Sequence, residues 1–156
     1  MKKIPAILAS SLCLVAVAAI AQDDSRFRPG EWELSPFATY VDKAGDNWGA
    51  GASLTYFISK NFGVGGTTYW TDFSGTFFDN AAAEGQFRLP FLKSLAPYLC
   101  ASIGYQFDSE EWFETFGGGV NFRPFDKIAA FSDVQWRIAN DTQDGIFIRL
   151  GVRFDF

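Results

Sequence analysis

Histidine is absent from this sequence of 156 residues, and cysteine occurs only twice. Without histidine, Ser–His–Asp and Cys–His catalysis are excluded, and a transition-metal site would lack its commonest ligand. The two cysteines are Cys13 and Cys100, and only Cys100 lies beyond the N-terminal apolar segment, so the rest of the chain cannot form an internal disulfide. We therefore expect no enzyme, and neither a cofactor nor a metal site.

Positive charge and long apolar runs are also scarce. Lys and Arg number 13 against 18 Asp and Glu, and the formal net charge is −5. This acidity argues against nucleic acid as a partner. Beyond residue 21, no stretch approaches the ~18 apolar residues of a transmembrane helix.

The one long apolar segment is at the start, MKKIPAILASSLCLVAVAAIAQ. Lys2 and Lys3 make it basic at first, and the triplet Ala19-Ile20-Ala21 supplies the small residues of a cleavage site. We predict a signal peptide over residues 1–21, removed before Gln22, and hence export of the chain. Residues 22–30, QDDSRFRPG, are polar and end in Pro-Gly, so we predict a flexible N-terminal lead there.

Residues 31–156 are dominated by alternation of apolar and polar residues with a period of two. This period is typical of a β-strand with one apolar and one polar face. Runs of about ten residues match the ~9–11 that a tilted strand needs to cross a bilayer. The runs are Trp32–Val41, Asn47–Ile58, Phe62–Thr71, Ala81–Leu89, Tyr98–Phe107, Trp112–Arg123, Ile128–Ile138 and Ile146–Phe156. We predict an all-β domain, an eight-stranded antiparallel up-and-down transmembrane β-barrel over residues 31–156.

The apolar faces sort their aromatic residues by position along the strands. One group lies beside acidic connections and comprises Tyr40, Trp48, Trp70, Tyr105, Trp112 and Trp136. The other group lies at the opposite strand ends and comprises Trp32, Tyr56, Phe62, Phe122 and Phe154. Aliphatic residues such as Leu54, Ile103 and Leu150 lie between the groups. Aromatic girdles around an aliphatic band are typical of a barrel whose apolar face contacts lipid. The alternative is a secreted soluble β-barrel that turns this face inward around a small apolar ligand.

The polar faces would then point into the lumen, which eight strands leave just wide enough for side chains to fill. Four acids and four bases lie there: Glu33, Glu84, Asp133, Asp155, Arg88, Arg137, Arg149 and Arg153. Buried charges persist when they are paired, so we predict a lumen charge network. Closing the last strand onto the first should bring Glu33 near Arg153, and Asp133 should lie diagonally near Arg149. A carboxylate pair such as Glu84 and Asp133 could in principle act as acid and base, but we interpret both as salt-bridged.

The connections differ in charge between the two ends of the predicted barrel. One set holds Asp42, Asp46, Asp72, Asp79, Asp108, Glu110, Glu111, Asp141 and Asp144. We interpret this acidic rim as a solvated surface. As an alternative, it could hold Ca²⁺ or Mg²⁺ loosely and so bind lipopolysaccharide phosphates or another surface partner.

Four stretches resemble the small bacterial outer-membrane β-barrel proteins, the OmpA/OmpX-like family. They are YFISKNFGVG, APYLCASIGYQF, GGGVNFRPFDKIAAFSDVQWRI and the terminal RLGVRFDF. The ending with Val152, Phe154 and a final Phe156 is similar to the family's assembly signal, which the barrel-insertion machinery reads. The stretches cover the barrel only, so tethering to the cell wall is not implied.

The resemblance implies a monomeric protein of the Gram-negative outer membrane, in contact with lipid and lipopolysaccharide. It also implies a structural role in envelope integrity, with a filled polar lumen and at most a narrow, porin-like conductance. Barrel enzymes of this class that deacylate lipid use a histidine, which this chain lacks.

Overall fold

The computed structural model describes residues 25–43, 45–70, 79–139 and 145–156. The predicted signal peptide and residues 22–24 of the predicted lead lie outside these ranges. Eight strands follow one another along the chain: β1 (Trp32–Lys43), β2 (Gly45–Phe57), β3 (Phe62–Trp70), β4 (Asn80–Arg88), β5 (Leu95–Gln106), β6 (Glu111–Phe122), β7 (Ile128–Ala139) and β8 (Gly145–Asp155). No helix among the described residues is long and apolar enough to span a membrane.

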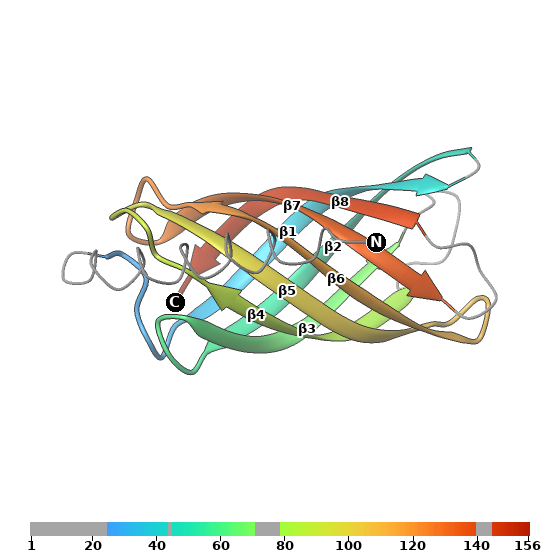
Figure 1. The fold of residues 1–156 in the computed structure, drawn as a ribbon, viewed down its shortest axis with the longest axis horizontal. Coiled ribbons are helices and arrows are strands. Elements are labelled where there is room, and N and C mark those ends of the chain that lie inside the picture. The colour runs from blue at the N-terminus through green and yellow to red at the C-terminus, as the bar shows by residue number, and fades with distance from the viewer. Residues whose placement is uncertain (1–24, 44, 71–78, 140–144) are drawn as a thin grey trace, which may run out of the picture.

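The strands form one closed barrel in which every pair is antiparallel, as the sequence predicted (Figure 1). Closure is completed beyond β8, where the Trp32 N–H donates to the Phe156 carbonyl (3.2 Å) and the Phe156 N–H donates to the Trp32 carbonyl (3.1 Å). A closed ladder satisfies its backbone groups internally, which is the condition for crossing a bilayer with strands. The three connections 58–61, 89–94 and 123–127 lie at one end, here called the turn end, with the C-terminus. The opposite end is called the loop end.

Strand β5 begins at Leu95, three residues before its predicted start. Pro97 lies within it although proline cannot donate a hydrogen bond to a ladder. The Pro97 carbonyl accepts from the Leu89 N–H (2.8 Å), beyond the last residue of β4. The missing donor therefore falls where the ladder to β4 has already ended.

The apolar face of the strands points outward. Leu54, Ile103 and Leu150 are 41%, 52% and 63% exposed, whereas Arg149, adjacent to Leu150 on β8, is 2% exposed. An apolar outer wall around a charged interior is the reverse of a soluble barrel, in which the apolar face forms the core. The alternative of a soluble barrel with an apolar interior is therefore wrong.

The aromatic residues of both predicted girdles lie on this outer wall and are exposed or half-buried. Cross-strand neighbours contact each other, with ring centroids 5.0 Å apart for Trp32 and Tyr56 and 5.1 Å apart for Tyr40 and Trp48. Glu114 interrupts the apolar wall two residues from Trp112, where it is exposed and paired with Ile103 and Ile138. A carboxylate next to the girdle costs less than one at the centre of the hydrocarbon layer.

The interior is less uniformly polar than the sequence predicted. Rings from the inward positions fill much of it: Phe37, Phe57, Tyr69, Tyr98, Phe113, Phe131 and Phe147. Several lie against glycines on the neighbouring strand, and a Cβ added to Gly51 would be 2.6 Å from both Phe37 Cζ and Tyr69 Cβ. Glycine therefore makes the space that lets aromatic side chains occupy so narrow a lumen.

Leu150 tests the outward orientation because it lies midway along β8. We expect Leu150→Lys to lower the free energy of unfolding in phospholipid vesicles by about 2–4 kcal/mol, since it places a charge in hydrocarbon. Urea titration of the refolded barrel measures this difference. Asp108→Lys, at an exposed position in the connection 107–110, is the control and should change stability by less than about 0.5 kcal/mol. A loss at Leu150 no larger than the control's would contradict a lipid-facing position.

Candidate functional site

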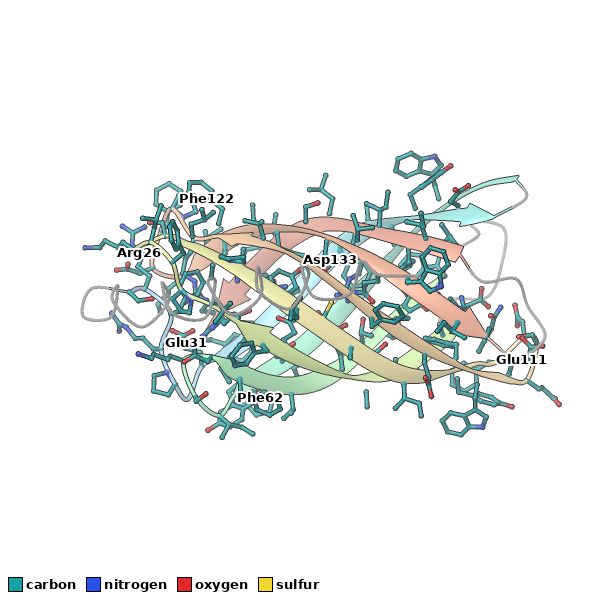
Figure 2. All side chains as sticks on the ribbon, viewed as in Figure 1. Arg26, Glu31, Phe62, Glu111, Phe122 and Asp133 are labelled. Carbon is teal, nitrogen blue, oxygen red and sulfur yellow. The ribbon has the colours of Figure 1, made fainter. Side chains whose placement is uncertain are left out.

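The centre of the lumen is bridged by Arg149, which is fully buried on β8. Its guanidinium contacts Asp133 on the adjacent β7 (Nη2 to Oδ2, 2.9 Å) and Glu84 on β4 across the barrel (Nη1 to Oε2, 2.7 Å). Asp133 is directly opposite Arg149 in the β7–β8 register, not diagonal as predicted. One arginine therefore ties two walls of the barrel together through its interior, and Figure 2 shows Asp133 at mid-length.

The two carboxylates at this bridge also accept hydrogen bonds from neutral side chains. The Tyr98 hydroxyl donates to Asp133 Oδ2 (2.5 Å), and Gln135 Nε2 donates to Asp133 Oδ1 (3.2 Å). Gln86 Nε2 donates to Glu84 Oε1 (2.7 Å). Buried carboxylates are tolerated when such donors complete their hydrogen bonding. Two acids can therefore share one arginine.

A second group of charges, the turn-end cluster, is centred on Glu33. Its carboxylate accepts from Arg88 (2.5 Å), Arg123 (2.6 Å) and Arg153 (3.2 Å). Glu31 also pairs with Arg88 (3.3 Å) and Arg123 (3.0 Å). Asp155 pairs with Arg123 at 3.1 Å. The cluster consists of Glu31, Glu33, Asp155, Arg88, Arg123 and Arg153, so three carboxylates meet three guanidinium groups.

Gln86 joins the two groups of charges. Its Nε2 donates to Glu84 at the central bridge, and its Oε1 accepts from Arg153 Nη1 (3.1 Å) in the turn-end cluster. The Arg153 guanidinium lies 4.7 Å from the Tyr98 ring centroid and 4.4 Å from that of Phe131. Polar and aromatic contacts are therefore continuous from the centre of the barrel to its turn end.

Arg137 does not join the charge network to which the sequence assigned it. It is buried inside the barrel, but it has no ion pair with a described carboxylate. Its guanidinium lies 4.3 Å from the Phe113 ring centroid and donates to Gln106 Oε1. Alternation identified the correct face, but it does not give the depth of a residue along the barrel axis. Arg137 lies on β7 like Asp133, but four residues closer to the loop end.

Two charged members of the turn-end cluster were missed by the sequence analysis. Arg123 ends the predicted run Trp112–Arg123 and was not included in the charge network, but it is completely buried. It has the same parity as the inward residues Thr115 and Asn121, a signal that could have identified it. Glu31 precedes β1 and shares the parity of Glu33, so the inward face continues past both strand ends.

The predicted flexible lead is anchored over its described part. Phe27 is 2% exposed, and its ring centroid lies 4.9 Å from Arg88 Cζ and 4.6 Å from Arg123 Cζ. Contact between guanidinium groups and an aromatic face is stabilising and removes apolar surface from water. Phe27 therefore fixes part of the predicted lead against the turn-end cluster. The polar composition of the segment gave no sign of this role.

The lumen offers little for chemistry. The carboxylates of Glu31, Glu33 and Asp155 lie within 4.8 Å of one another, a spacing that could suit a divalent cation, but the three arginines already neutralise them. Cys100 is buried, with its sulfur 4.0 Å from Arg149 Nη2. The arrangement fits internal bracing of the barrel better than binding of a metal or a covalent step.

The acidic rim is described only in part. Asp42, Asp108 and Glu110 are exposed, as expected, and Glu111 is half-buried. Asp79, which directly precedes β4, is buried, so its side chain is not part of a solvated surface. Asp72, Asp141 and Asp144 lie outside the described residues, as does the side chain of Asp46. The assembly-signal residues Val152, Phe154 and Phe156 are all exposed on the outer wall.

Arg149 allows a direct test of the central bridge. We expect Arg149→Met to lower the free energy of unfolding by about 3–5 kcal/mol, because it leaves Glu84 and Asp133 buried without their counter-ion. Urea unfolding in vesicles measures the loss. Arg28→Met is the matched control, since Arg28 is exposed and should change stability by less than about 0.5 kcal/mol. Equal effects of the two substitutions would show that the bridge does not brace the barrel.

Comparison with known proteins identifies the fold. No protein-family model matches the chain, and no curated protein matches it. Among solved structures, de novo designed transmembrane β-barrels superpose with a TM-score of 0.63 at 18% identity, over 83% of this chain and 98% of theirs. The N-terminal β-barrel domain of OprF from Pseudomonas aeruginosa gives 0.63 at 15% identity, over 83% and 99%. The outer membrane protein OprG from Pseudomonas aeruginosa gives 0.60 at 11% identity, over 85% and 99%. The chain has the eight-stranded transmembrane-barrel fold of the small OmpA/OmpX-like outer-membrane proteins.

Proposed function

We propose that this protein is a scaffold of the bacterial outer membrane, with a structural role in envelope integrity and at most a narrow conductance. The chain would reach this location by export and by insertion of the barrel through its terminal strand. It would act as a monomer in contact with lipid and lipopolysaccharide. Its function would require no catalysis and no cofactor.

The observation that supports this role most directly is the filled lumen. Arg149 reaches from β8 to Glu84 on β4, so the central section is crossed by an ion pair 2.7 Å long. Toward the loop end, the rings of Tyr69 and Phe147 lie 4.8 Å apart, and that of Phe113 lies 6.2 Å from Tyr69. Toward the turn end, three arginines converge on Glu33. An eight-stranded barrel has room for its own side chains and little else.

The outer wall supports the same role. Nearly all its described residues are apolar or small, and its two aromatic girdles are suited to the two lipid boundaries. A rigid plugged cylinder with such a wall contributes membrane area and packing to an envelope without opening a path through it.

Planar-bilayer recording of the refolded barrel tests the closed lumen. We expect current steps far smaller than those of a water-filled porin, since charged and aromatic side chains occupy the path. Phe147→Ala removes a buried ring from the lumen, and Phe116→Ala removes an exposed ring from the outer wall. Only Phe147→Ala should raise the conductance. Large, long-lived steps from the unsubstituted protein would overturn the plugged scaffold.

The envelope role needs a separate measurement. In the bacterium that encodes the protein, deletion of its gene should increase uptake of a dye that an intact outer membrane excludes. The intact gene and the Phe116→Ala variant should both restore exclusion. Unchanged dye uptake after deletion would argue against a structural role even if the lumen is closed.

A further inference from the structure

A surface pocket of about 330 Å³, here called the rim pocket, lies at the turn end beside the turn-end cluster. Its walls come from three parts of the chain: the segment before β1, the connection 123–127 and the end of β8. Backbone groups tie these walls together, since the Asp155 N–H donates to the Lys127 carbonyl (3.0 Å) and the Arg28 N–H donates to Glu31 Oε1 (2.9 Å). Figure 2 shows Glu31 at this end of the barrel. The lining residues are Arg28, Glu31, Asp126, Lys127, Asp155 and Phe156.

Two cationic side chains of the rim pocket have no partner among the described residues. Arg28 and Lys127 are both exposed, and neither side chain forms a hydrogen bond or an ion pair there. Every other described arginine side chain donates to an acceptor of the protein. Unpaired lysine and arginine groups on one pocket favour an anionic ligand group, of which phosphate is the commonest.

The same pocket also offers hydrogen-bond acceptors. The Asp126 side chain is 76% exposed, and its described partner is Arg26 at 3.2 Å. The Asp155 side chain is 7% exposed, and its Oδ1 pairs with Arg123 at 3.1 Å. Asp155 Oδ2 accepts no hydrogen bond from a described residue. A buried carboxylate oxygen without a donor favours a ligand group that carries both N–H and positive charge. The complementary ligand therefore has a cationic N–H group close to a phosphate.

The rim pocket adjoins the lipid-facing wall. Phe156 lines it and is 69% exposed at the end of the apolar face of β8. Trp32 of the turn-end girdle is bound to Phe156 by two backbone hydrogen bonds of 3.1 and 3.2 Å. Aromatic girdles mark the boundary between hydrocarbon and water, which is where phospholipid headgroups lie. A phosphate in the pocket is therefore within reach of acyl chains on the outer wall.

We propose that the rim pocket binds the headgroup of a phospholipid that carries a primary amine, phosphatidylethanolamine. Its phosphate accepts from Lys127, with Arg28 adding positive charge beside it, and its ammonium donates to Asp126 and Asp155. A glycerol headgroup has the phosphate but no ammonium, and the quaternary nitrogen of a choline headgroup has no N–H to donate. Each of them therefore lacks one half of the match. This inference rests on the proposed function only in that the barrel lies in a lipid bilayer, and it does not depend on the closed lumen.

Native mass spectrometry of the refolded barrel, released from detergent micelles, measures the occupancy by single lipid molecules. The probes are palmitoyl-oleoyl phosphatidylethanolamine, phosphatidylcholine and phosphatidylglycerol, each titrated alone with a chelator of divalent cations present. We expect the first phosphatidylethanolamine to reach half-occupancy at a concentration about 10-fold lower than either other lipid. The difference corresponds to one hydrogen bond between charged groups that the other two headgroups cannot form.

Two substitutions separate the two halves of the headgroup. Asp126→Asn removes the exposed carboxylate, so it should abolish most of the preference for phosphatidylethanolamine while changing the affinity for the other two lipids little. Asp108→Asn, at an exposed carboxylate of the loop end, is its control and should keep the preference.

Lys127→Gln should weaken all three lipids by a similar factor, about 3- to 5-fold, because they share the phosphate. Lys93→Gln, at an exposed position of the connection 89–94, is the matched control and should leave all three affinities unchanged. Heat-modifiable gel mobility verifies that each variant is folded.

The outcomes separate the headgroup site from the scaffold. Equal affinity for the three lipids, tightest binding of phosphatidylglycerol, or a preference that survives Asp126→Asn overturns the site. If Asp126→Asn does not fold, the unsubstituted protein decides through the mono-, di- and trimethylated forms of phosphatidylethanolamine. Affinity must then fall as N–H groups are replaced by methyl groups, and a flat series overturns the proposal. Large current steps or unchanged dye uptake would count against the scaffold, but they leave this comparison of lipids valid.

Discussion

Charges inside a closed strand ladder have no bulk water to solvate them, so they need compensating contacts from other inward side chains, most often an opposite charge. Arg149 meets this constraint by contacting Asp133 beside it and Glu84 across the barrel. That bridge spans the lumen between β8 and β4. Because the charged side chains are paired inside the lumen, the outward face of each strand can consist of apolar residues. The aromatic girdles and the closed lumen both follow from this division between the two faces of each strand.

The same constraint explains why acids and bases remain balanced in the lumen, although the sequence analysis did not find every residue of the charge network. It missed Arg123 and Glu31, one base and one acid, and both belong to the turn-end cluster. An additional buried arginine without an additional acid would be a charge without a partner, which costs several kcal/mol. Arg137, the member placed away from the carboxylates, lies instead against the Phe113 ring and Gln106. Its surroundings show that an aromatic face and an amide can accommodate an arginine near the loop end.

Period-two alternation was sufficient to predict the fold. It located all eight strands within about three residues at each end, and it identified the face to which Leu54, Ile103 and Leu150 belong. The contact between Glu33 and Arg153 followed from closing β8 onto β1, because that step needs only the strand order. Positions that depend on register were less certain, and Asp133 lies directly opposite Arg149 instead of diagonal to it. Phe27 could not be placed at all, since a single aromatic residue in a polar segment has no period that assigns it a partner.

The kind of side-chain contact that fills the lumen changes along the barrel axis. The loop-end half is held by contacts between rings, the centre by one arginine with two carboxylates, and the turn end by three ion-paired arginines, two of which lie against the Phe27 ring. Parting the central contacts would leave Glu84 and Asp133 buried without their counter-ion. Parting the turn-end contacts would break the ion pairs of Glu31 and expose the Phe27 ring. Because each level is closed by contacts of a different kind, loss of one level leaves the other two in place, and this redundancy is consistent with a lumen that stays filled.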